Sequence, residues 1–399
     1  MKRMALAVAA ALASIGFAGN TLAQEKTVSI AAFGVKSGVL RLFGLNSEAA
    51  INAAVEEVNR AGGVKLADGS KAKMVVQPYL DDRCNAEEGI AVVRRLVGTD
   101  ALVAIGPTCS NVAEPLYGIL QKKVDDPKDT GLQFPILTDV AIKVGLAQIS
   151  EWSFRNVPNE NTMYSSLYYW LKTTRPELKT VYGGVEEDFA HSRASWHVVM
   201  KERANANGYK VLGESKWLLN DTNFSTQVRE IKKANPDILS IAAHPFTTCG
   251  LLKEMERQGV KPKLVVGLTS TSSQETMQGC PKQAEGMIIP SSFAPVSKEA
   301  KFASEQTAKK KGAADLHSMA AWENVFILKE VMEQAGISGK KDAASVQADR
   351  RKVRDGLAAL KTTKGLLGTN KRTADREADK PYVFVHAKSG NWLVLHNPL

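Results

Sequence analysis

Residues 28–60 read VSIAAFGVKSGVLRLFGLNSEAAINAAVEEVNR, and this stretch decides the fold class. It opens with a short apolar run, Val28–Phe33, of the kind that forms a buried strand. A glycine-punctuated loop at 34–38 follows, and a helix is predicted from about Ser47 to Arg60, capped at its start by Asn46 or Ser47. Its apolar positions recur at the spacing of one buried helical face. They are Ile51, Ala54, Val55 and Val58.

The same alternation of strand and helix continues along the chain. Further strands are predicted at Met74–Tyr79, Ala101–Ile105 and Phe134–Thr138, and the rhythm restarts after Trp152. Strands separated by helices of this length predict parallel, doubly wound sheets, here in two lobes with a cleft between them. In such sheets, ligands bind beyond the carboxyl ends of the strands. The strands predicted in the second half are Thr180–Val185, Lys210–Lys216, Ile238–Ala242, Leu264–Gly267 and Met287–Pro290.

The C-terminal part of the chain departs from this rhythm. Residues 298–360 are predicted to be mostly helical, and Lys361–Lys380, rich in charge, Thr and Gly, to be an exposed loop. Tyr382–Ala387 and Trp392–Leu395 are predicted to pair as a hairpin around the turn at 389–391.

The first residues predict export. Lys2 and Arg3 precede an apolar run, Met4–Ala18, and small residues lead to a cleavage site after Ala23. These are the parts of a secretory signal peptide. The alternative, a membrane anchor, needs roughly 20 apolar residues, more than this run supplies. We therefore expect residues 1–23 to be removed and the mature protein to be periplasmic.

The composition of the chain is that of a globular protein. Hydrophobic residues make up 44% and charged residues 24%, and the length exceeds what one core accommodates, so two lobes are expected. The formal net charge is +10, but the basic residues are spread along the sequence, which argues against a nucleic-acid surface. The positive charge gives weak support for an anionic ligand.

The four cysteines are Cys84, Cys109, Cys249 and Cys280. An even number in an exported protein favours disulfides. Three pairings are possible, and pairing of chain neighbours is the simplest because each bond would then lie inside one lobe. A zinc site is the alternative, but no CxxC or HxxxH spacing accompanies these residues. We expect no metal site.

The common catalytic signatures are absent from the sequence. There is no GxSxG elbow, no GxxxxGK[ST] loop and no GxGxxG after the first strand. The six histidines show no metal-binding spacing. We therefore expect no catalytic residues and no cofactor. The alternative is a hydrolytic enzyme using His191 or His244, with partners that only folding would bring together.

Several loops resemble those of type I periplasmic binding proteins of the leucine/isoleucine/valine-binding family. Phe33–Gly38 followed by Phe43 resembles the first-strand loop of that family, and Ile105–Ser110 resembles a second loop in the same lobe. Residues 220–238 are similar to the signature of the second lobe, and 152–158 to the first hinge crossing. The resemblance covers essentially the whole mature chain, in order, and extends to the aromatic-acid-binding branch.

This resemblance implies two Rossmann-like lobes that close on a ligand by hinge motion. It also implies delivery of the ligand to an inner-membrane ABC permease by a monomeric protein, with hinge crossings near 150–156, 287–293 and 376–382. The expected division is a signal peptide at 1–23, lobe 1 at 24–152 and 289–378, lobe 2 at 153–288, and a C-terminal hairpin of lobe 2 at 379–399.

The resemblance also implies which residues meet the ligand. In the family, first-lobe hydroxyls and backbone N–H groups hold a carboxylate. Ser110 matches this pattern at a predicted helix start, where N–H groups favour an anion. The alternative is that Ser110 only caps the helix. Ala141 stands where the family uses a backbone N–H, but Ile142 replaces a common hydroxyl residue. The remaining candidates are Ser37 and Cys109 in the first-lobe loops, the aromatic Phe43 and Phe189, and His244 and Phe246 after the strand 238–242.

The loop after Gly267 departs from the amino-acid binders of the family. Those proteins carry an acidic residue about two positions further on, which holds the ammonium group of the ligand. Here no carboxylate occurs before Glu275, and burying an unpaired ammonium is costly. Thr269 and Ser270 suit a hydroxyl or carbonyl group instead. We therefore expect a small organic acid, with an aromatic acid first; the alternatives are an amino-acid receptor and a periplasmic ligand-sensing module.

Overall fold

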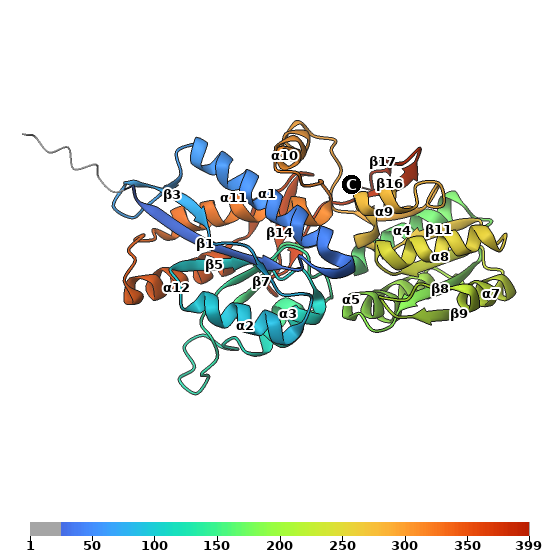
Figure 1. The fold of residues 1–399 in the computed structure, drawn as a ribbon, viewed down its shortest axis with the longest axis horizontal. Coiled ribbons are helices and arrows are strands. Elements are labelled where there is room, and N and C mark those ends of the chain that lie inside the picture. The colour runs from blue at the N-terminus through green and yellow to red at the C-terminus, as the bar shows by residue number, and fades with distance from the viewer. Residues whose placement is uncertain (1–24, 399) are drawn as a thin grey trace, which may run out of the picture.

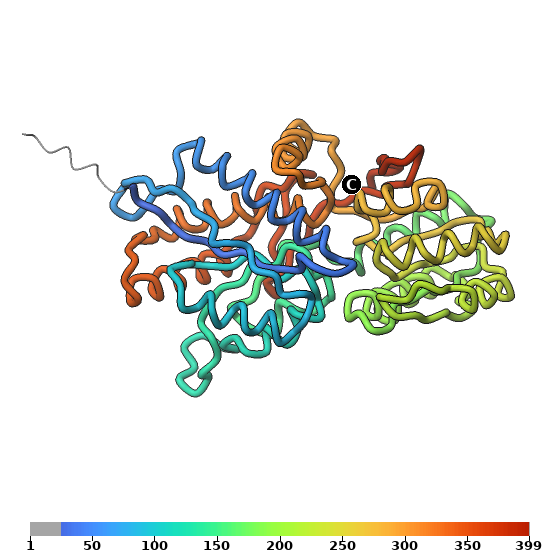
Figure 2. The backbone as a smooth tube through the Cα atoms, viewed as in Figure 1, coloured from blue at the N-terminus to red at the C-terminus, as the bar shows by residue number. Residues whose placement is uncertain are grey.

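The computed structural model describes residues 25–398. It consists of two α/β lobes that lie side by side along the long axis of the molecule (Figure 1). The predicted signal peptide, 1–23, lies outside the described residues. Within residues 25–398, no helix is long and apolar enough to cross a membrane. Figure 2 follows the chain from the first lobe into the second and back.

The sheet of the first lobe has the strand order β2-β3-β1-β5-β6-β7, and β4 pairs with the carboxyl end of β1, beyond the part of β1 that pairs with β3. β1, β3, β5, β6 and β7 pair in parallel, as the apolar runs of the sequence predict. Core clusters cover both faces of this sheet. The strands are β1 (Thr27–Gly34), β2 (Val64–Lys65), β3 (Lys71–Val76), β4 (Leu80–Asp81), β5 (Ala101–Ile105), β6 (Ile136–Thr138) and β7 (Ser153–Arg155).

Six helices belong to the first lobe, and one of them, α10, packs on α1 and α11 rather than on the sheet. α1 and α11 lie against one face, where they also contact each other, and α2 and α3 lie against the other (Figure 1). The helices are α1 (Arg41–Arg60), α2 (Ala86–Val97), α3 (Ser110–Gly118), α10 (Lys298–Lys309), α11 (Leu316–Ala335) and α12 (Ala343–Ala359).

The first helix begins earlier than predicted. α1 starts at Arg41 rather than near Ser47, and Ser47 is a buried residue in its interior instead of a cap. No side chain caps this start, so the extra turns are held by packing of Leu40 and Phe43 in the core. Gly44 permits that packing, because a methyl group there would collide with the carbonyl of Val35.

The sheet of the second lobe has the order β17-β16-β12-β11-β10-β8-β9. Its strands from β8 to β12 are parallel, whereas β16 and β17 form the predicted antiparallel hairpin at one edge. The strands are β8 (Thr180–Glu186), β9 (Lys210–Trp217), β10 (Ile238–Ala242), β11 (Leu264–Gly267), β12 (Ile288–Ser291), β16 (Val383–Lys388) and β17 (Asn391–His396). The helices are α4 (Glu160–Thr174), α5 (Ala190–Ala194), α6 (Lys201–Ala206), α7 (Ser225–Ala234), α8 (Pro245–Arg257) and α9 (Gln274–Gly279).

The prediction of an exposed loop over 361–380 is wrong. This segment forms a small antiparallel sheet of β13 (Thr362–Lys364), β14 (Thr369–Arg372) and β15 (Ala378–Asp379). Asn370 and Lys380 are buried within or beside it. The polar composition was misleading because these side chains are buried with partners, which only the folded chain supplies.

The chain passes between the lobes after β7, after β12 and after β15. The lobe boundary expected after residue 152 therefore precedes β7, which still belongs to the first sheet. The boundary expected after residue 288 falls at the first residue of β12. Both disulfides join chain neighbours within one lobe: Cys84 bonds to Cys109, and Cys249 to Cys280.

A buried ion pair joins two of these crossings to the first lobe. Lys380 Nζ lies 2.5 Å from Glu323 Oε2 on α11, and the two side chains are 3% and 5% exposed. The same ammonium donates to the carbonyl oxygen of Asn156 at 3.2 Å, and the amide of Asn156 donates to Glu323 at 3.1 Å. A second pair, Arg155 with Glu377 at 2.8 Å, links the same crossings. The charges are satisfied only in this arrangement.

Replacing Lys380 by Met should lower the free energy of unfolding by about 3–5 kcal/mol, because Glu323 would keep its buried charge without a cation. Urea unfolding of the two proteins measures the difference. Lys26→Met is the matched control: its ion pair with Asp68 is half-exposed, so little change is expected. Equal effects of the two substitutions would contradict the role given to the buried pair.

Candidate functional site

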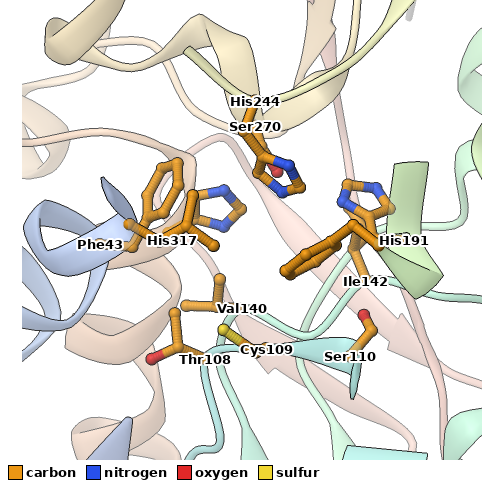
Figure 3. Close-up of a pocket in the computed structure, with 12 residues that line it drawn as sticks. Phe43, Thr108, Cys109, Ser110, Val140, Ile142, His191, His244, Ser270 and His317 are labelled. Carbon is orange, nitrogen blue, oxygen red and sulfur yellow. The ribbon is translucent and has the colours of Figure 1, made fainter. Parts of the chain in front are cut away.

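A pocket lies between the lobes, where loops from both sheets meet (Figure 3). Its first-lobe wall comes from α1, from the loops after β5 and β6, and from the start of α11. Its second-lobe wall comes from α5 and from the loops after β10 and β11. The free space is about 10 Å³, close to the volume that admits one water-sized sphere. The lobes are therefore closed over the pocket, which must widen to hold a ligand larger than a water molecule.

Contacts across the cleft hold the lobes in this closed arrangement. Phe189 of the second lobe packs into a core cluster of the first. The ring of Phe43 lies 6.2 Å from that of His244, edge to face, and the backbone N–H of Ala190 donates to Asn111 Oδ1 at 2.6 Å. The edge-to-face geometry is a favourable one for aromatic rings.

The amino terminus of α3 forms the floor of the first-lobe wall. β5 leads into Thr108 and Cys109, and Ser110 is the first residue of α3. The disulfide to Cys84 ties this turn to the start of α2. Ser110 Oγ accepts a hydrogen bond from the backbone N–H of Lys143 at 3.2 Å. The free N–H groups of a helix start carry partial positive charge, so this floor suits an anion.

Two buried carboxyl groups lie behind the first-lobe wall. Burial raises the pKa of Asp82 to about 7, and repulsion from Asp81 adds to the effect. Burial likewise raises the pKa of Asp139 to about 7, with repulsion from Asp82 adding to it. Asp82 Oδ2 and Asp139 Oδ1 have no hydrogen-bond partner among the described residues. Both groups therefore carry a proton for much of the time at neutral pH.

Two histidine–glutamate pairs build the second-lobe wall. His191 Nε2 lies 3.0 Å from Glu160 Oε1, at the start of α4. His244 Nδ1 lies 2.5 Å from Glu186 Oε2, at the end of β8. The imidazoles line the pocket, whereas the carboxylates lie behind them. Ser270 completes this wall.

Both carboxylates are fully hydrogen-bonded within the second lobe. Glu160 accepts from Ser195 Oγ at 2.5 Å and from Thr269 Oγ1 at 2.6 Å. Burial raises the pKa of Glu160, but the imidazole of His191 and these hydrogen bonds outweigh it and leave the pKa below its usual value. The pKa of Glu186 is lowered in the same way, with burial outweighed by His244 and its hydrogen bonds. The two acids are thus ionised at neutral pH.

His317 lies at the start of α11, on the first-lobe side. Its side chain is buried, and the ring of Phe43 lies 5.0 Å away, edge to face. Burial, together with repulsion from His191 and His244, holds the pKa of His317 well below its usual value. This imidazole is therefore neutral.

The structure brings most of the predicted site residues together. The pocket is lined by Phe43, Cys109, Ser110, Ile142, Phe189, His244 and Ser270. Ala141 is buried between two lining residues, Val140 and Ile142.

Three predicted residues lie elsewhere. Ser37 is a half-buried residue that hydrogen-bonds Asp81, and Thr269 turns away from the pocket to donate to Glu160. Phe246 lies on α8 with 39% of its surface exposed. Leu40, His244 and Ser270, which lie close to them along the chain, line the pocket, but the three predicted residues do not.

Sequence reasoning missed five lining residues and the two glutamates. Glu186 carried a usable signal, because it directly follows the predicted strand 180–185 at its carboxyl end. His317 carried none, since it lies in a helical region far from any predicted strand. The missed lining residues are Leu40, Thr108, Val140, His191 and His317. Within residues 25–398, no group of three or more His, Cys, Asp or Glu is arranged to hold a metal ion.

Comparison with known proteins identifies the family. Residues 27–391 match the family model described as periplasmic binding protein. The leucine-, isoleucine-, valine-, threonine-, and alanine-binding protein of Pseudomonas aeruginosa is 24% identical over 371 residues, which cover 91% of each chain.

Two solved structures share the fold. One is the branched-chain amino acid transporter substrate binding protein of Streptococcus pneumoniae in complex with isoleucine. Its TM-score is 0.75 at 18% identity, over 92% of this chain and 98% of that one. The other is a solute binding protein of an ABC transporter from R. palustris in complex with benzoate. Its TM-score is 0.76 at 15% identity, over 93% and 96% of the two chains.

The family match spans nearly the whole described chain, and the two-lobed fold with its closed pocket agrees with it. The chain belongs to the periplasmic binding protein family, and within that family it is similar in sequence and fold to proteins that bind branched-chain amino acids.

Proposed function

We propose that this protein captures a small aromatic carboxylate between its lobes and delivers it to an inner-membrane ABC permease. It acts in the periplasm as a monomer, after removal of the signal peptide predicted at 1–23. The observation that carries the proposal is the chemistry of the pocket wall. Of the described residues that line the pocket, none is acidic, and the second-lobe acids Glu160 and Glu186 stand behind histidines.

The floor of the pocket supports a carboxylate. The start of α3 offers backbone N–H groups and the hydroxyl of Ser110, and both interact favourably with a negative charge. Because the pKa values of Asp82 and Asp139 are raised to about 7, each carboxyl carries a proton part of the time at neutral pH, which reduces the repulsion that a bound anion would meet. An anionic group fits here better than a cation.

The walls support an aromatic ring. Phe43 and Phe189 line the pocket from opposite lobes, and both are buried in the closed structure. A planar ligand between them would bury apolar surface against both lobes, and would thereby favour closure. The R. palustris structure of this fold, solved with benzoate, gives a precedent for such a ligand.

An amino acid is the second candidate, and one observation favours it. Glu160 and Glu186 are ionised and lie directly behind the second-lobe wall, so a ligand ammonium that displaced His191 or His244 would find a carboxylate. The relative from P. aeruginosa is named for binding amino acids. This binding mode would require breaking the hydrogen bonds that each glutamate already makes.

Thermal unfolding in the presence of candidate ligands separates the two proposals. Benzoate- and cinnamate-type acids should raise the melting temperature by several degrees, because a ligand at one hundred times its Kd adds about 2.7 kcal/mol of stability. Leucine, isoleucine and valine should leave it unchanged. The opposite pattern would identify the protein as an amino-acid receptor.

Ser110→Ala should weaken binding of the carboxylate ligand by about 1–3 kcal/mol, because a hydrogen bond to a charged group is lost. Calorimetric titration of both proteins measures this loss. Ser225→Ala is the matched control, since Ser225 also opens a helix, α7, but lies outside the pocket and should leave affinity unchanged. Equal affinity of Ser110→Ala and the unaltered protein would remove Ser110 from the ligand site.

The raised pKa of Asp139 predicts how stability depends on pH. Between its ordinary value of 3.8 and about 7, the folded protein holds a proton that the unfolded chain has released. Stability therefore falls as the pH rises through this window. Asp139→Asn cannot titrate and should not show this loss. The free energy of unfolding of the variant, minus that of the unaltered protein, should therefore increase by roughly 2–4 kcal/mol from pH 4.5 to pH 8. Urea unfolding at a series of pH values measures both free energies. If they depend on pH in the same way, Asp139 titrates normally.

A further inference from the structure

His317 is a polar side chain in the pocket whose hydrogen-bonding groups are unused. It is 1% exposed, and neither ring nitrogen has a hydrogen-bond partner among residues 25–398. Its ring points into the space at the centre of the pocket, on the opposite side from Ser110 (Figure 3). Buried polar groups of folded proteins are nearly always paired, so two unpaired nitrogens in a ligand pocket indicate a group that arrives with the ligand.

The other two histidines of the pocket differ from His317 in this respect. His191 and His244 each bind a glutamate through one nitrogen, which fixes the orientation of each ring. Behind His317 there is no such acid. The nearest carboxylate along the chain is Asp315, whose Oδ1 accepts from the backbone N–H groups of His317 and Ser318 as the cap of α11. Its Oδ2 has no hydrogen-bond partner among the described residues, and it does not pair with the imidazole of His317.

The state of the ring limits which ligand group can pair with it. As a neutral imidazole, His317 offers one N–H donor and one acceptor nitrogen. A hydroxyl group both donates and accepts, so it can pair with either nitrogen. A ligand ammonium can pair only with the acceptor nitrogen and a second carboxylate only with the N–H, whereas a hydroxyl suits either tautomer of the neutral ring.

The residues around His317 indicate that this hydroxyl belongs to an aromatic ring of the ligand. Phe43 lies edge to face against the imidazole, and both side chains face the same space. A ligand whose carboxylate meets the α3 start and whose ring lies beside Phe43 presents its far edge toward the histidines.

We propose that His317 is a specificity-determining residue that hydrogen-bonds a ring hydroxyl, so the ligand class is hydroxylated aromatic acids. This inference rests on the proposed function and narrows it. The unsubstituted acid would leave His317 unpaired, and sites built to hydrogen-bond a hydroxyl discriminate strongly against ligands that lack one.

Calorimetric titration with matched ligand pairs tests this. Benzoate is compared with its three monohydroxy derivatives, and cinnamate with its three, on the full mature chain. At least one hydroxylated acid should bind about tenfold or more tightly than its parent acid. His317→Phe, which keeps an aromatic ring without the nitrogens, should lose that preference, so it should bind the hydroxylated and the parent acid with affinities within about threefold of each other.

Two further variants separate recognition from a structural role. His317→Gln retains a donor and an acceptor, so part of the preference for the hydroxylated acid should return. His396→Phe is the matched control: His396 stacks on Trp170 in the second lobe, away from the pocket, and its replacement should change neither affinity.

The outcomes distinguish this inference from the function on which it rests. If aromatic acids bind with no preference for a hydroxyl, or if His317→Phe weakens both members of a pair equally, the inference is wrong and the proposed function stands. If no aromatic acid binds at all, the proposed function is wrong, and this inference with it.

Discussion

The carboxyl ends of the parallel strands in each sheet face the other lobe, and the pocket depends on this constraint. Loops that leave β5 and β6 in one sheet meet loops that leave β10 and β11 in the other. Residues distant in sequence therefore share one small space. Other interactions keep these loops in place. A disulfide holds the turn before α3, and the Lys380–Glu323 ion pair joins the crossings between the lobes to α11.

The two walls of the pocket have different chemistry. The first-lobe wall presents a helix start and hydroxyl groups, and behind it lie two buried carboxyls whose pKa values are raised to about 7. The second-lobe wall presents imidazoles that screen ionised carboxylates from the ligand. This asymmetry orients a ligand with one anionic end, and a hydrogen-bonded Glu160 or Glu186 is already satisfied without an ammonium. The closing contacts between Phe43 and His244 depend on the same two walls.

Buried parallel strands could be predicted from the sequence because they are continuous apolar runs. Three strands have the predicted bounds: Ala101–Ile105, Ile238–Ala242 and Leu264–Gly267. Ser110 and His244, which follow such strands, were predicted from the resemblance to the binding-protein family, and both line the pocket. Features set by partners distant in sequence could not be predicted. The start of α1 depends on core packing, the sheet at 362–379 on buried polar pairs, and the place of His317 on how α11 meets the cleft. Thr269 was misplaced because its partner, Glu160, comes from another helix.

The central claim is that an organic acid binds between the lobes with its carboxylate at the start of α3. A crystal structure with the tightest-binding acid tests it most directly. We predict that the carboxylate lies within hydrogen-bond distance of Ser110, with the ring between Phe43 and Phe189. A ligand whose charged group instead contacts Glu160 or Glu186, or one bound outside the pocket, would contradict the account.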